Sequence, residues 1–138
     1  MRKALTVVIL CGALLAPLIA AAQSTAPAQS PALPENAEER MLQLAQILGS
    51  LHYVRKLCEP ADGDFWRDRM MEMIRLEKPS VAERDQLTQQ FNQGFNDATT
   101  RFPTCTQDAK EFAAATARQG EALAQALSDS INMSPGPG

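Results

Sequence analysis

The sequence has few of the side chains that carry catalysis or hold metal ions. Its 138 residues include one histidine, one tryptophan, one tyrosine and three cysteines, and aromatic residues make up 5% of the chain. No alternation of polar and apolar residues predicts a strand, and no segment repeats another. The sequence therefore contains no constellation specific for one chemistry, and we expect no cofactor and no metal site.

Basic charge is also scarce. Without Arg2 and Lys3, the chain holds 11 basic and 16 acidic residues, a net charge of −5. No stripe of lysine and arginine gathers on one predicted helix face, as nucleic-acid binding would need. This balance disfavours nucleic acid and anionic lipid surfaces as partners.

The N-terminus has the pattern of a cleavable signal peptide. Arg2 and Lys3 precede an apolar run from Ala4 to Ile19, and small residues follow at Ala20–Ala22. The run is too short to span a bilayer comfortably, and a polar segment with prolines follows it. We therefore expect residues 1–22 to be removed on export, a periplasmic location, and no stable membrane insertion afterwards.

Two cysteines, Cys58 and Cys105, lie downstream of the predicted cleavage site. An exported chain folds in an oxidising compartment, where an even number of cysteines favours a disulfide. Neither residue has a CxxC or CxxxH spacing, which disfavours the alternative of a metal ligand or a reactive thiol. Closing this loop would stabilise the fold by about 4 kcal/mol through the entropy of the unfolded chain.

The rest of the chain divides by composition. Residues 23–34 are small, polar and rich in proline, which predicts a disordered linker, and residues 132–138 predict a disordered tail. Residues 35–131 have helical periodicity throughout. The chain thus predicts one all-α domain after its linker.

Capping residues and breakers divide this domain into four helices. We expect the first from Asn36 to about Cys58, before the breaker cluster at residues 59–63. The second begins after Asp64 and ends at Lys78 and Pro79, and the third follows a Ser80–Glu83 capping box and ends at Pro103. Thr104 or Thr106 caps the fourth. Short loops favour a small antiparallel four-helix arrangement, which brings both cysteines to one end.

The run LGSLHYVRKLC, followed by DFWRDRM, QQFNQGFND and TCT, carries a resemblance. These motifs are similar to those of an uncharacterised family of small secreted alphaproteobacterial proteins. Its members have His-Tyr-x-Arg-x-x-Cys, Trp-Arg, Phe-Asn-x-Gly-Phe and a second cysteine before the last helix. The resemblance implies export and paired cysteines, and it implies no activity. Glu59-Pro60 departs from the family, where a glycine is expected after the first cysteine.

The densest cluster of functional side chains lies beside the first cysteine. Its members are the candidate binding residues His52, Tyr53, Arg55, Trp66 and Arg67. One interpretation is an anion pocket lined by Arg55, Arg67 and Tyr53, since guanidinium groups hold anions in a bidentate manner. The alternative is an Arg–Asp network that ties two helices together, with His52 as a hydrogen-bonded structural residue rather than a base or ligand.

Two further features have structural interpretations. Met70, Met71 and Met73 carry thioethers, which are typical ligands of Cu(I). Consecutive helical residues point apart, and Met70 and Met73 share the expected core face, so packing of the core is the favoured interpretation. Gly94 interrupts the third predicted helix, which suggests close packing of Trp66 or another helix against it.

These observations predict a non-enzymatic interaction or accessory module, with an envelope protein as its partner. The alternative is a small-ligand protein that binds an anion or a metal through His52, Tyr53, Arg55 and Arg67. The sequence names no catalytic residue, and it leaves the oligomeric state open.

Overall fold

The computed structural model describes Leu33 and residues 36–133. The predicted signal peptide, nearly all of the linker and most of the tail lie outside the described residues. Within them the chain is all-helical and contains no strand, which confirms the predicted fold class. The elements are α1 (Ala37–Cys58), the short helix η1 (Pro60–Asp62), α2 (Phe65–Glu77), α3 (Val81–Arg101) and α4 (Gln107–Met133).

The helix ends lie close to where the caps and breakers predict them. The Asn36 side chain accepts a hydrogen bond from the Glu39 amide at 2.7 Å, and Ser80 with Glu83 forms a full capping box. Lys78 ends α2 in the left-handed conformation, with a φ of 48°. The Thr106 hydroxyl accepts from the Ala109 amide at the start of α4. The last helix continues to Met133, two residues past its expected end.

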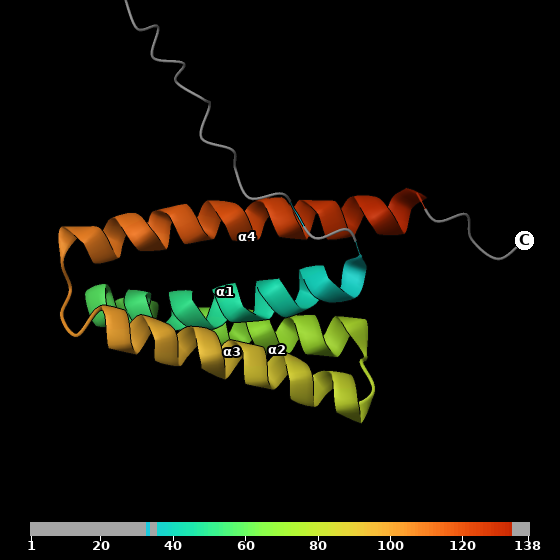
Figure 1. Cartoon of the computed structure of the whole chain (residues 1–138), viewed down its shortest axis with the longest axis horizontal. Coiled ribbons are helices and arrows are strands. Elements are labelled where there is room, and N and C mark those ends of the chain that lie inside the picture. Colours follow the sequence, from blue (N-terminus) through green and yellow to red (C-terminus); the bar gives the residue numbers. More distant parts are fainter. Residues whose placement is uncertain (1–32, 34–35, 134–138) are drawn as a thin grey trace, which may run out of the picture. The chain divides into compact units, whose positions relative to one another are not determined.

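Helix α1 is the centre of the domain (Figure 1). It packs against α3, α4 and α2, whereas these three helices make few contacts with one another. Each helix runs opposite to the one before it, so α2 and α4 are parallel to each other and antiparallel to α1 (Figure 1). The domain is therefore three helices arranged around a central one.

The closest helix contact joins α1 and α3 through two glycines. A Cβ atom on Gly94 would lie 1.9 Å from the Gln46 carbonyl oxygen, and one on Gly49 would lie 1.9 Å from the Phe91 carbonyl oxygen. The Ser50 hydroxyl donates across the same contact to the Gly94 carbonyl at 3.0 Å. Of the two predicted neighbours of Gly94, Trp66 or another helix, the structure shows another helix, α1. Only a residue without a side chain fits at either glycine position.

Two groups of buried side chains hold the helices to α1. One surrounds Leu51, Val54 and Leu123, and it joins α1 to α4 and to the C-terminal end of α3. The other surrounds Leu48 and Met70, and it joins α1 to α2 and to the first half of α3. Because α1 supplies residues to both groups, it is buried along most of its length.

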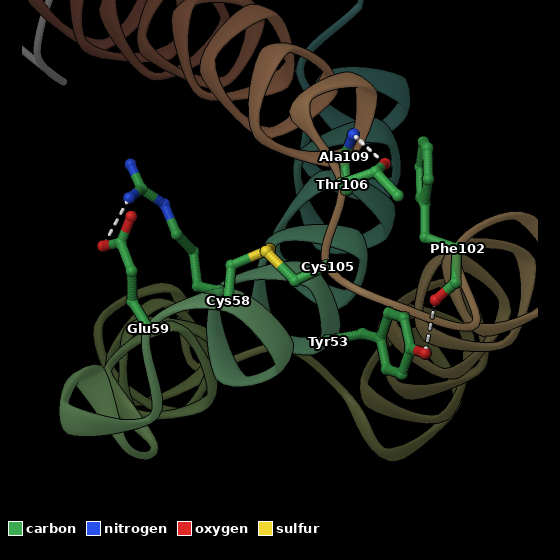
Figure 2. The surroundings of a disulfide bond; sticks show 8 residues. Tyr53, Cys58, Glu59, Phe102, Cys105, Thr106 and Ala109 are labelled. Carbon is green, nitrogen blue, oxygen red and sulfur yellow. Dashed lines mark hydrogen bonds and ion pairs between the residues drawn. A yellow bond between two sulfur atoms is a disulfide. The ribbon is translucent and has the colours of Figure 1, made fainter.

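The disulfide confirms the predicted pairing. Cys58 ends α1 and Cys105 precedes α4, and their Cα atoms are 5.1 Å apart. Figure 2 shows the bond joining these two segments. The antiparallel order of the helices places both residues at one end of the domain, as the sequence predicts.

Candidate functional site

The end of the domain that holds the cystine is closed by side-chain contacts to backbone. The Tyr53 hydroxyl donates to the Phe102 carbonyl at 2.7 Å (Figure 2). This hydrogen bond fixes the loop that leads from α3 to Cys105. The Tyr53 ring also meets Phe95 edge to face. Tyr53 therefore has a structural partner at both its ring and its hydroxyl.

The single histidine is buried against aromatic rings. His52 is 8% exposed, and its ring centroid lies 5.9 Å from those of both Phe91 and Phe95. Burial lowers the pKa of His52 below its ordinary value, and the nearby charge of Lys56 lowers it further. The ring is thus neutral at pH 7. Its Nδ1 atom has no hydrogen-bond partner among the described residues.

The two candidate arginines pair with different carboxylates. Arg55 contacts Glu59 one helical turn away at 2.7 Å, and Arg67 contacts Asp64 at 3.2 Å. The Lys56 Nζ atom on α1 lies 3.7 Å from the Asp64 carboxylate, at the residue that precedes α2.

A hollow of about 300 Å³ brings His52 and Tyr53 together, with Lys56, Leu57 and Phe95 as its other lining residues. Arg55 and Arg67 are not part of this lining. Only His52 and Tyr53 share this hollow, while Arg55 and Arg67 lie in separate ion pairs. The binding role of the cluster stays a prediction.

A larger hollow lies elsewhere on the described residues. It is an open groove of about 520 Å³ between α2 and α4, with α1 as its floor, called here the α2–α4 groove. Of the candidate residues only Trp66 lines it. From Phe65 to Glu77 its α2 wall is about 18 Å long at the helical rise per residue. A groove of this size can bury a substantial apolar partner.

All three helices present the same spacing to the groove. On each, the lining residues include positions i, i+3, i+7 and i+10, which is the a/d pattern of a coiled-coil seam. Such a seam normally packs against a further helix. The three seams are Met41, Leu44, Leu48 and Leu51 on α1; Trp66, Arg69, Met73 and Leu76 on α2; and Ala117, Gly120, Ala124 and Leu127 on α4.

The edges of the groove combine exposed apolar and charged side chains. Phe65 is 45% exposed and Leu76 is 60% exposed, both on the α2 edge. The Arg69 guanidinium lies over the Phe65 ring, 4.9 Å from its centroid. Glu121 lies on the α4 edge. Glu77 lines the end of the α2 wall, so that wall carries both a cation and a carboxylate, and the α4 wall carries a carboxylate.

The described residues show neither a metal-binding cluster nor a membrane-spanning helix. No three or more histidine, cysteine, aspartate or glutamate residues in this part of the chain are placed to share a metal ion. None of its helices is both long and apolar enough to cross a membrane.

A family model with the description "Protein of unknown function (DUF2385)" matches residues 37–130. The chain belongs to this family. No curated protein and no solved structure matches it. The match starts at the first residue of α1 and ends inside α4, so the DUF2385 domain comprises all four helices. The match confirms that residues 37–130 belong to a family of unknown function.

Sequence reasoning did not find the groove of the DUF2385 domain. The apolar residues Met41, Leu44, Leu48 and Leu51 have the spacing of an ordinary core-facing stripe. The a/d spacing on three helices is visible in the sequence, but it is equally typical of helix faces that are fully buried. Only the packing shows that α2 and α4 do not meet over α1.

Proposed function

We propose that this protein is an exported accessory module of the cell envelope that acts by binding another protein and not by catalysis. The export half of the proposal is supported by the signal-peptide pattern of residues 1–22 and by a cystine, which persists in oxidising compartments. The family assignment agrees with the proposal without adding an activity.

The observation that carries the binding half is the α2–α4 groove. An apolar surface bordered by polar groups is typical of an interaction site. Here Phe65 and Leu76 are exposed at the edge of a 520 Å³ groove, with Arg69 and Glu121 on its two sides. The rest of the domain packs tightly around α1, so the open face is a local feature of the fold.

The test uses protein exported from cells of the source organism, after mild crosslinking and purification without reductant. Native mass spectrometry is expected to find an oxidised chain that starts at Gln23, together with a covalent complex. Ala124→Arg places a charge in the groove and is expected to abolish the complex. Ala122→Arg is the matched control, because Ala122 is exposed on the same helix but does not line the groove.

Either of two results contradicts the proposal. A chain that keeps residues 1–22 and stays in the cytoplasm refutes export. A chain that yields no complex, or the same complex from both variants, refutes the groove as the binding surface.

A further inference from the structure

The α2–α4 groove has the shape of a bundle that lacks one helix. Around a coiled-coil axis, each a/d seam packs its side chains between those of its neighbours. Helices α1, α2 and α4 supply three such seams to one open axis, while α3 lies on the other side of α1 (Figure 1). The open groove between α2 and α4 lies where a further helix of such a bundle would pack, with its axis 8–10 Å from theirs.

Within residues 36–133, a second copy offers no exposed apolar seam other than the edges of its own groove. The large apolar side chains exposed among the described residues are Leu33, Phe65, Met71, Leu76 and Val81. Phe65 and Leu76 already border the groove, and the remaining three do not form a seam on one helix. The occupant must therefore bring an apolar seam of its own.

The two edges of the groove indicate what charges that helix carries. Arg69 on α2 favours a carboxylate directly opposite it. Glu77 at the end of α2 and Glu121 on α4 favour a lysine or arginine opposite each of them. The α4 seam is mostly small, with Ala117, Gly120 and Ala124. Large aliphatic or aromatic side chains on the occupant fill the space that these residues leave.

We propose that the groove binds one amphipathic α-helix of a partner protein, about 12 residues long at the helical rise per residue. The helix carries large apolar residues at a/d spacing, an acidic residue opposite Arg69, and basic residues opposite Glu77 and Glu121. This inference rests on the proposed function and specifies the kind of partner. It corresponds to the known mode in which a helix lies in an apolar groove and is anchored by residues at i, i+3, i+4 and i+7.

The experiment selects helices from a displayed peptide library against the oxidised chain. Each peptide has 18 residues, with Leu, Ile, Met or Phe at the a and d positions and random residues elsewhere. Trp66, the only tryptophan, lines the groove and reports binding through its fluorescence. We expect enriched peptides that change this emission and carry an acidic residue opposite Arg69.

Variants then locate the bound helix. Ala124→Arg and Leu76→Glu, on opposite walls, are each expected to weaken binding at least 100-fold, and Ala122→Arg is expected to leave it unchanged. Arg69→Glu is expected to weaken binding of the selected peptide. A peptide in which the acidic residue opposite position 69 is changed to lysine is expected to restore binding to this variant. Circular dichroism and the unfolding midpoint of each variant check that the fold is intact.

Three outcomes overturn the inference. The first is a library without enrichment, and the second is a set of peptides that bind the wild type and both wall variants equally. The third is a dimer of the wild-type chain that Ala124→Arg dissociates, since a second copy then occupies the groove. If no peptide binds while the crosslinked complex from cells persists, the helix is refuted and the proposed function stands.

Discussion

The substitution Gly94→Ala tests the packing on which the whole arrangement depends. The new Cβ atom would lie 1.9 Å from the backbone oxygen of Gln46, and backbone within a helix cannot rotate away as a side-chain tip can. Relief requires α1 and α3 to separate by roughly 1 Å, which costs about 1–3 kcal/mol as overpacking. The hydrogen bond from Ser50 to the Gly94 carbonyl adds about 1 kcal/mol to the loss.

Higher helix propensity offsets these costs by about 1 kcal/mol, so the expected net loss in the free energy of unfolding is about 2 kcal/mol. Urea denaturation of the oxidised chain measures this, and the melting temperature is expected to fall by about 12 °C. Gly120→Ala is the matched control. Its Cβ atom would approach the Ile47 side chain at 3.1 Å, and that side chain can move. A Gly94→Ala variant within 1 kcal/mol of the wild type would refute the close α1–α3 contact.

Three more predictions follow from the end of the domain that holds the cystine. Replacing Cys58 and Cys105 by serine is expected to lower the free energy of unfolding by about 4 kcal/mol, since the disulfide closes a loop of sequence separation 47; an unchanged urea midpoint contradicts this. Tyr53→Phe removes the hydrogen bond to the Phe102 carbonyl and is expected to cost about 1 kcal/mol by the same assay, whereas a neutral effect means that the loop is held in another way. Because burial lowers the pKa of His52 below 6.5, the unfolded chain binds a proton first as the pH falls, so stability decreases from about pH 6.5 downward. His52→Gln is expected to flatten that part of the stability curve, and a slope that persists in the variant assigns it to other groups.

The sequence was sufficient to predict the elements and their order. Caps such as Asn36 and Ser80 act through their own local hydrogen bonds, so they mark helix starts without knowledge of the fold. Breakers such as Pro79 and Pro103 act locally in the same way. The cystine was predicted from the even number of cysteines in an exported chain, and the antiparallel order supported it by bringing Cys58 and Cys105 to one end.

The packing of side chains was less predictable, because it depends on which helices meet. Gly94 signalled a close approach, but its partner Gly49 showed its role only when α1 was seen against α3. Arg55 and Arg67 were expected in one cluster, but Arg55 pairs with Glu59 and Arg67 pairs with Asp64, each only a few residues away in the sequence. The α2–α4 groove could not be predicted, since apolar periodicity does not distinguish a buried seam from an open one.

Scanning α4 with a photo-crosslinking residue, one position at a time in cells of the source organism, tests the central claim most directly. The claim is that the α2–α4 groove is where this protein binds its partner. It predicts a crosslinking yield that follows the helical period, with maxima at Ala117, Ala124 and Leu127 and a minimum at Ala122. Equal yields at all positions, or maxima on the face of Ala122, would contradict it.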